Sequence, residues 1–248
     1  MTTTVAALDT VLPGAVVAAV RTDDDPRAVL PPEEEAAVAK AVTSRRAEFT
    51  TARGCARDAL ARLGAPAAAI PVGEKRAPVW PDGVVGAITH CAGFRAAAVA
   101  WREAVRTVGL DAEPHVALPA GVLEAVSDPG ERAVLASLAT SAPEVRWDKV
   151  LFSAKESVYK AWFPLTGTWL GFEDAELVPA RDGTFRATLR VPGPVVDGGE
   201  VTGFEGRWVV HDGLVITAIA LPARPPAAAT NVLFAASRRP NDAFAGER

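Results

Sequence analysis

The hydrophobic and polar positions between residues 152 and 162 follow a helical period, and Pro164 is expected to end the helix. At 100° per residue, four apolar side chains share one face: Leu151, Ala154, Val158 and Trp162. Glu156 and Lys160 lie one turn apart on the opposite side, where a favourable ion pair is expected. Lys155 projects from the edge of the apolar face, so its ammonium must reach water or meet an anion. Taken alone, this pattern favours an ordinary surface helix with one ion pair.

Residues 108–114 have the pattern of a buried strand that ends in two acids. Alternate side chains of a strand point to the same face, so Asp111 and Glu113 lie together, and Pro114 ends the ladder. Two acids on one face repel each other unless a cation lies between them. If Glu156 joins them, the site has only oxygen ligands, which favours Mg²⁺ completed by water and phosphate oxygens.

The rest of the pattern alternates between helical and strand-like stretches. Helices are expected from residue 32 to about 42, from 44 to 63, and from 120 to 139 with a break at 128–130. Strands are expected at 11–20, 84–89, 94–101, 105–111, 184–191, 204–210 and 214–221. Asp212-Gly213 predicts a hairpin between the last two strands. Each half of the chain therefore combines helices with antiparallel strands.

Composition excludes several classes of protein. Of the 248 residues, 49% are hydrophobic, which is enough for a sizeable core. The net charge of −4 argues against a protein that wraps nucleic acid or coats a membrane surface. The N-terminal residues carry no basic segment, and no stretch approaches a membrane span. A soluble, cytoplasmic protein is expected, without nucleic-acid or membrane partners.

Cysteine and lysine are both scarce. Cys55 and Cys91 have no metal-ligand spacing and are expected to be reduced, buried thiols. Most basic side chains are arginine, so a position that keeps lysine can require a compact point charge. Lysine occurs at positions 40, 75, 149, 155 and 160.

Two stretches together resemble the paired signature of the 4′-phosphopantetheinyl transferases. The run Gly109–Glu113 reads GLDAE, and the run Phe152–Lys160, about forty residues later, reads FSAKESVYK. The likeness extends from Arg45 to Leu221. It is to the longer, monomeric class typified by the surfactin- and enterobactin-activating enzymes, and is nearest to the actinobacterial representatives.

The resemblance implies an α+β fold of two similar halves with antiparallel sheets, related by a pseudo-twofold, with the ligand in the cleft between them. Residues 1–108 would supply the contacts to the nucleotide of coenzyme A, and residues 109–221 the metal and catalytic motifs. Residues 222–248, rich in alanine and proline, would form a loosely ordered tail. A monomer is expected.

The resemblance also implies a reaction. The enzyme would transfer 4′-phosphopantetheine from coenzyme A to a serine of apo acyl or peptidyl carrier proteins, releasing adenosine 3′,5′-bisphosphate. These carriers belong to fatty-acid, polyketide and peptide synthases. Mg²⁺, or Mn²⁺, would bind Asp111, Glu113 and Glu156, and Glu156 would also serve as general base, directly or through a metal-bound water. Lys155 would stabilise the leaving phosphate, and Lys155 and Lys160 would hold the phosphates.

Basic residues upstream would bind the nucleotide end of coenzyme A. Residues expected in this role are Arg45, Arg46 and Arg53 on the helix from 44 to 63, Lys75 and Arg76 in a glycine-containing turn, and Thr89 with His90. Without the resemblance, the arginines fit a solvated basic face, the turn fits a solvated turn, and His90 fits a core histidine.

Two other functions use the same residues. A Mg²⁺-dependent phosphohydrolase or nucleotidyl transferase would need the acids and cations, although the many basic residues exceed what simple hydrolysis requires. An inactive carrier-binding module is the second alternative, and the complete set of acids and lysines argues against it. Residues 120–147 are a candidate docking region for the carrier, with Leu123, Val126, Leu135 and Leu138 as apolar anchors beside Arg132 and Arg146. A plain packing helix fits that stretch equally well.

Overall fold

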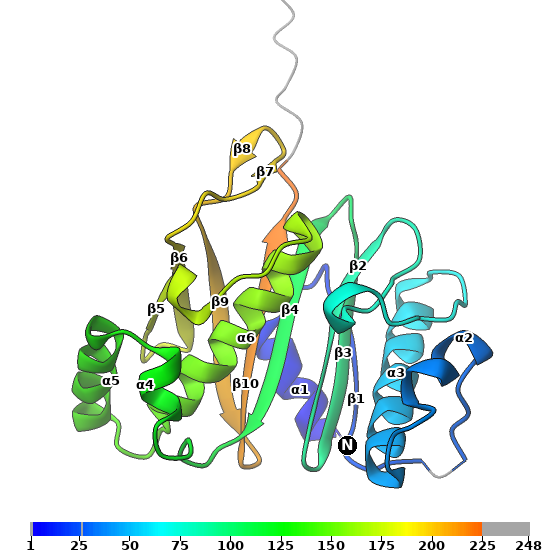
Figure 1. Cartoon of the computed structure of the whole chain (residues 1–248), viewed down its shortest axis with the longest axis horizontal. Helices are drawn as coiled ribbons and strands as arrows, with labels where there is room; N and C mark the ends of the chain where they lie inside the picture. Colours follow the sequence, from blue (N-terminus) through cyan, green and yellow to red (C-terminus); the bar gives the residue numbers. More distant parts are fainter. Residues whose placement is uncertain (1, 26, 225–248) are drawn as a thin grey trace, which may run out of the picture.

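The two larger sheets of the described chain are antiparallel and lie side by side (Figure 1). The structure, a computed structural model, describes residues 2–25 and 27–224, with side chains described from residue 6 onward. The first sheet has the order β1-β3-β2, with β1 at Val17–Arg21, β2 at Val84–Cys91 and β3 at Phe94–Trp101. The second has the order β4-β10-β9-β6-β5, with β4 at Val105–Pro114, β5 at Ala175–Pro179, β6 at Thr184–Leu189, β9 at Gly203–His211 and β10 at Leu214–Pro222. The expected mixed fold with antiparallel sheets is confirmed, whereas the pseudo-twofold relation stays a prediction.

Helices pack on both sheets. They are α1 (Thr2–Val11), α2 (Pro32–Glu35), α3 (Thr43–Leu63), α4 (Val122–Val126), α5 (Pro129–Ser141) and α6 (Trp147–Thr166). Short 3-10 turns occur as η1 (Ala36–Val38), η2 (Glu74–Arg76) and η3 (Phe172–Asp174), and a small hairpin is formed by β7 (Val195–Val196) and β8 (Gly199–Glu200). Helix α3 covers the first sheet, and α6 crosses the second (Figure 1).

Helix α3 matches its prediction because its small residues allow close packing. Cys55, Ala56 and Ala59 are fully buried against Ala97 and Val99 of β3. The helix ends at a glycine in the left-handed conformation, with φ of 78°, as a C-terminal glycine typically does.

Helix α6 is longer than its pattern predicted. It begins at Trp147 and continues past Pro164 to Thr166, so the expected end at Pro164 is wrong. Pro164 lies inside the last turn, where it removes one backbone hydrogen bond, and the helix ends at Gly167 with φ of 65°. The predicted apolar face is confirmed, since its four members are buried: Leu151, Ala154, Val158 and Trp162.

Helix α6 approaches β4 so closely that only glycine fits between them. A Cβ on Gly109 would lie 2.0 Å from the carbonyl oxygen of Ser157. Thr107 lies two residues before Gly109 on the same face of β4. It donates a hydrogen bond from Oγ1 to the carbonyl oxygen of Ala161 at 2.8 Å. This close packing places Asp111, which lies two residues after Gly109 on the same face of β4, against α6.

The first strand was predicted too early. Residues 2–11 form α1, and β1 begins only at Val17, because Leu8, Val11 and Leu12 have a helical spacing that the neighbouring β-branched residues obscured. The expected strand from residue 11 to 20 is therefore wrong in its first half. The strand β5 and the β7–β8 hairpin were not predicted.

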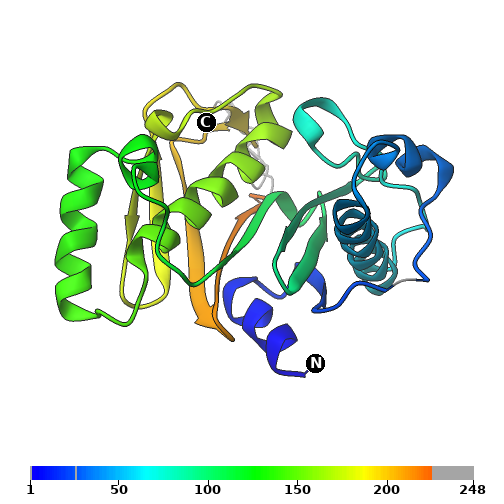
Figure 2. The ribbon, with the colours of Figure 1, turned by 60° about the horizontal axis from the view of Figure 1, so that its bottom comes forward.

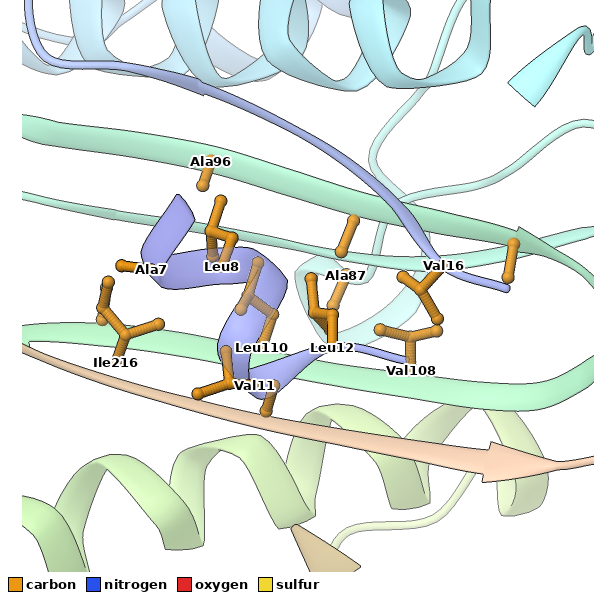
Figure 3. Packing of buried hydrophobic residues seen from close by; sticks show 14 of the residues in the cluster. Ala7, Leu8, Val11, Leu12, Val16, Ala87, Ala96, Val108, Leu110 and Ile216 are labelled. Carbon is orange, nitrogen blue, oxygen red and sulfur yellow. The ribbon is translucent and has the colours of Figure 1, made fainter. Parts of the chain in front are cut away.

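Helix α1 lies between the two sheets, on the face of β4 opposite α6 (Figure 2). Figure 3 shows its apolar side chains against residues of both sheets. Members of this cluster are Ala7, Leu8, Val11 and Leu12 from α1 and the adjoining turn, Ala87 and Ala96 from the first sheet, and Val108, Leu110 and Ile216 from the second. The hydrophobic core is thus continuous between the sheets.

The expected docking anchors between residues 120 and 147 are part of the core. Val126 and Leu135 are 5% exposed, and Leu123 and Leu138 pack against the same cluster. The break at 128–130 is confirmed, because Asp128 caps α5 through a capping box with Glu131. Packing therefore accounts for Val126 and Leu135, while carrier docking through this region, with the partly buried Leu123 and Leu138 and with Arg132 and Arg146, stays a prediction.

Two further expectations concern the ends and the membrane. The expected tail, residues 222–248, lies outside the described residues from 225 onward. Within the described ranges, no helix is both long and apolar enough to span a bilayer. Both cysteines are free thiols, and Cys55 is buried while Cys91 is half-buried.

Candidate functional site

A cavity of about 390 Å³ lies between the first sheet and α6. One wall comes from the turn at η2 and from β2, and the other from α6. Charged residues on its walls are Lys75 and Arg76 on one side and Glu156 and Lys160 on the other. A cleft with cations on both walls and a carboxylate at its edge suits a phosphorylated ligand.

The two acids of β4 lie beside α6, as the strand pattern predicted. Asp111 is 4% exposed, and its Oδ1 accepts a 2.7 Å bond from Nζ of Lys160. The expected ion pair between Glu156 and Lys160 is therefore wrong, since the lysine reaches across to the strand instead. Ser153 donates to the other oxygen of Asp111 at 2.8 Å.

The three carboxylates form one electrostatic cluster. Burial raises the pKa of Glu113, and the negative charge of Asp111 raises it further, while Lys149 opposes the shift. Burial also raises the pKa of Glu156, again reinforced by Asp111 and opposed by Lys160. Among the described residues, no donor forms a hydrogen bond with the Glu156 carboxylate, so this side chain is available to a ligand.

The cluster fits a hard divalent cation in its chemistry. All three side chains offer oxygen, and the charge of Asp111, after burial, is the second cause that raises the pKa of each glutamate. In the part of the chain that the structure describes, however, no three acidic, histidine or cysteine side chains converge into a ready ligand set. Asp111 and Glu113 are turned toward Lys160 and Lys149.

Lys155 does not join this cluster. Its side chain is 4% exposed, and its ammonium lies 2.9 Å from Glu131. It also donates to the carbonyl oxygens of Phe172 at 2.7 Å and Ala175 at 3.1 Å. A buried lysine requires an anion, and in this structure the anion is the carboxylate of Glu131. Lys155 was expected to hold a phosphate, and its ammonium is instead bound within the protein.

Thr89 and His90 are adjacent near the end of β2, so their side chains point to opposite faces of the strand and bind different residues. Thr89 is buried, and its Oγ1 donates to Asp111 at 3.3 Å and accepts from the backbone nitrogen of Ala112 at 3.1 Å. His90 accepts a hydrogen bond on Nε2 from Arg45 at 2.6 Å, because a guanidinium can only donate. Burial and then the charge of Arg45 lower the pKa of His90, so its neutral form is favoured.

A second cavity of about 850 Å³ adjoins the first, with Arg76, Pro78 and Ile88 on the walls of both. Arg45, Arg53 and His90 also line it. The expected grouping of Arg45, Arg53, Arg76 and His90 around one site is therefore present, whereas Arg46 is turned away and pairs with Glu35.

Arg53 is a buried cation without an acidic hydrogen-bond partner among the described residues. It is 4% exposed, its Nε has no hydrogen-bond acceptor, and its guanidinium lies 4.7 Å from the centre of the Phe49 ring. Burial lowers its pKa to about 10. Its neighbour Arg57, in contrast, makes two 2.9 Å bonds to the fully buried Glu34.

Lys75 and Arg76 lie on the exposed turn at η2. Both adopt positive φ, 48° and 67°, and both side chains are exposed. Neither forms an ion pair with any described residue. Two exposed cations without counter-ions at the mouth of a cleft are suited to an anion.

The sequence pattern missed four residues at the site. Glu131 and Ser153 bind Lys155 and Asp111, and Lys149 lies 3.3 Å from Glu113. Tyr159, the fourth, lines the cavity, and its hydroxyl is buried without a hydrogen-bond partner among the described residues. The scarcity of lysine could have drawn attention to Lys149, and the capping-box spacing from Asp128 could have drawn attention to Glu131. No sequence signal singled out Ser153 or Tyr159.

Comparisons with known proteins place this arrangement in context. A family model described as the 4′-phosphopantetheinyl transferase N-terminal domain matches residues 33–100, and one described as the 4′-phosphopantetheinyl transferase superfamily matches residues 107–210. The chain is 58% identical over 201 residues to 4′-phosphopantetheinyl transferase Svp of Streptomyces mobaraensis, covering 81% of this chain and 82% of that one. It is 51% identical over 189 residues to 4′-phosphopantetheinyl transferase PptT of Mycobacterium tuberculosis, covering 74% and 82%. It is 32% identical over 187 residues to enterobactin synthase component D of Salmonella typhimurium, covering 73% and 74%.

Proposed function

The chain belongs to the 4′-phosphopantetheinyl transferase superfamily, and from this premise we propose how its cleft binds coenzyme A and a carrier protein. The enzyme transfers 4′-phosphopantetheine to carrier proteins, so the alternatives of a phosphohydrolase and of an inactive binding module are dropped. The observation that carries the proposal is the position of Glu156, a carboxylate that has no ion-pair partner among the described residues and lies on the wall of a cleft that also bears cations.

The nucleotide of coenzyme A occupies the larger cavity in this proposal. Arg53 and Arg45 lie on its wall, and Arg53 has no acidic hydrogen-bond partner within the described residues, so an incoming phosphate or base would relieve a buried charge. Lys75 and Arg76 are assigned to the 3′-phosphate. The diphosphate crosses to the smaller cavity, between His90 and Lys160, where the two cavities adjoin. Arg46 has no part in this arrangement, because it pairs with Glu35.

The reaction needs a base and a stabilised leaving group. In our proposal the serine hydroxyl of the carrier attacks the β-phosphorus, and Glu156 accepts the serine proton. The bond from the β-phosphorus to the bridging oxygen breaks, and adenosine 3′,5′-bisphosphate leaves. In the metal-free protein, burial and then the charge of Asp111 raise the pKa of Glu156, so its carboxylate accepts a proton more readily than an ordinary glutamate does.

A divalent cation is the remaining component, and Mg²⁺ or Mn²⁺ suits the oxygen donors. We propose Asp111, Glu113 and Glu156 as the side chains that hold it. When bound, the ion adds positive charge beside the diphosphate. Lys160 lies 2.7 Å from Asp111 and adds a further charge from the protein itself.

We assign Lys155 a different role from the one its motif implies. Its ammonium is bound by Glu131 and by the carbonyls of Phe172 and Ala175. It thereby fixes η3 and the start of β5 against the helical turn that carries Glu156. In this proposal Lys155 positions the base and does not touch the phosphates.

The division of labour along the chain is also part of the proposal. Residues 1–108 contribute the nucleotide contacts, and residues 109–221 contribute the metal and catalytic groups. Both walls of the cleft come from one chain, which supports activity as a monomer. The carrier partners are those of fatty-acid, polyketide or peptide synthases. Two free thiols suit the reducing cytoplasm.

One assay tests this function directly. The enzyme is incubated with coenzyme A, Mg²⁺ and an apo carrier protein, and the carrier is weighed by mass spectrometry. We expect the carrier to gain the mass of one 4′-phosphopantetheine, and the gain to disappear when its acceptor serine is replaced by alanine. A carrier of unchanged mass with several different apo carriers would refute the proposal.

A further inference from the structure

Lys149 is a buried lysine in an unfavourable place. It lies in the first turn of α6, where the helix dipole presents partial positive charge and disfavours a cation. Its side chain is 8% exposed, and its ammonium lies 5.5 Å from the centre of the Phe152 ring. The contact with Phe152 is a weak cation–π interaction, and the helix dipole opposes the charge, so a stronger partner is expected.

The acidic cluster does account for it. Nζ of Lys149 lies 3.3 Å from Oε2 of Glu113, and it is the cation whose charge most opposes the raised pKa of that carboxyl. Lys160 binds Asp111 in the same way at 2.7 Å. Two of the three acids therefore already have an ammonium partner, and Glu156 has none within the described residues.

We propose that Lys149 is an internal counter-ion that competes with the divalent cation for Glu113 and so sets how tightly the enzyme binds metal. The inference rests on the proposed metal site. It also rests on the orientation of Asp111 and Glu113, which are turned toward Lys160 and Lys149. Metal binding requires Glu113 to leave Lys149, and this exchange lowers the metal affinity.

The competition makes a specific prediction about metal affinity. In Lys149→Met the stem keeps its packing, but Glu113 loses its partner and its repulsion from Asp111 is uncompensated. We expect Mn²⁺ to bind about fivefold more tightly to this variant, the size expected from releasing one partly exposed ion pair. Lys149→Arg keeps the charge and should bind Mn²⁺ as the wild type does.

The test measures free Mn²⁺ by electron paramagnetic resonance, on the full-length protein without coenzyme A. A double-variant cycle adds Glu113→Gln, in whose background Lys149→Met should no longer change Mn²⁺ affinity. Unchanged or weaker Mn²⁺ binding by Lys149→Met would overturn the inference, and weaker binding would show that the lysine orients Glu113. Thermal unfolding checks that each variant is folded, and Lys149→Gln replaces the methionine variant if that one is not.

Failure of this inference is distinguishable from failure of the metal proposal. If the wild type binds Mn²⁺ and Asp111→Asn does not, the metal site stands whatever Lys149→Met shows. If the wild type binds no Mn²⁺, the metal site and the role of Lys149 are both refuted. The transfer assay is separate from both, because it detects the product on the carrier.

Discussion

The two sides of the cleft treat positive charge differently. On the nucleotide side, Arg53, Lys75 and Arg76 have no acidic hydrogen-bond partner among the described residues. On the catalytic side, the three lysines of α6 each bind a carboxylate at 2.7–3.3 Å, and these lysines are Lys149, Lys155 and Lys160. The first arrangement leaves the charge for a ligand that arrives with its own anions, and the second compensates acids that are permanently part of the protein.

This difference predicts that cations on the two sides respond oppositely to substitution. A cation without a protein partner contributes to binding and little to stability, whereas a cation in a buried pair contributes to stability when its partner remains. Glu156, the acid left without a lysine, is the point at which the two sides meet.

The largest effect is expected at that acid. Glu156→Gln should lower the transfer rate by at least about 100-fold, because a positioned general base contributes roughly 10²–10⁴-fold. The rate is measured by mass spectrometry of the carrier at saturating coenzyme A. Circular dichroism provides the control for folding, and a folded variant with full activity would remove Glu156 from the reaction.

Lys155→Met tests the buried pair on the catalytic side. Glu131 is 2% exposed, so leaving it unpaired should lower the free energy of unfolding by about 3–5 kcal/mol. The double variant Lys155→Met/Glu131→Gln should regain part of that stability in urea unfolding, because glutamine removes the buried charge and keeps an oxygen acceptor for the backbone nitrogen of Leu177. It should also regain part of the activity if Lys155 acts by positioning. A stable but inactive double variant would instead support the phosphate contact that the motif implied.

Arg53 and Arg57 provide a matched pair on one helix. Arg53→Met should weaken coenzyme A binding at least tenfold, since a charge-assisted contact contributes about 1.5–3 kcal/mol, while stability is retained. Arg57→Met should lower the free energy of unfolding by about 3 kcal/mol, because the fully buried carboxylate of Glu34 loses its cation. Calorimetric titration and urea unfolding measure both quantities. Equal losses of stability in the two variants would contradict the distinction between the two kinds of cation.

The turn at η2 tests the assignment of the 3′-phosphate. Changing Lys75 and Arg76 together to alanine should weaken coenzyme A about tenfold more than 3′-dephospho-coenzyme A, since the second ligand lacks the group they are expected to bind. The two dissociation constants are compared in the same buffer. Similar losses for both ligands would place these side chains elsewhere on the nucleotide.

The smallest effect is a dependence of stability on pH. In metal-free protein, the pKa of Glu156 is raised above its ordinary value of 4.5, so between these two values the folded chain binds more protons than the unfolded chain. Its contribution to stability is therefore present at low pH and is lost as pH rises through the folded-state pKa. Urea unfolding of the wild type between pH 4 and pH 7 should show this loss relative to Glu156→Gln, where the group no longer titrates. Parallel curves would show that Glu156 has an ordinary pKa.

Local patterns predicted the elements that carry the site. The alternation in β4 and the helical period of α6 depend on residues close in sequence, and both elements formed with the expected faces. In contrast, α1 was missed because its alanines and β-branched residues fit the period of a helix and that of a strand equally well. The segment is helical because it fills the space between the two sheets.

The partners of the lysines could not be predicted in the same way. Glu131 and Asp111 are 24 and 49 residues from the lysines they bind. Such pairs depend on how α5 and β4 pack against α6, and no local spacing encodes that. The sequence showed that Lys155 needed an anion, but a phosphate and a protein carboxylate satisfy that need equally.

Helix α1 makes folding of the two sheets a single event. Leu8 and Val11 belong to one buried cluster that includes strands of both sheets, so neither sheet has a complete core when the helix is detached (Figure 3). Unfolding should therefore be cooperative across the whole enzyme, without a stable intermediate in which one half survives. The geometry of the nucleotide cleft is then linked to a helix on the opposite face of β4, and a change at the N-terminal end of the chain can alter coenzyme A binding without touching the ligand.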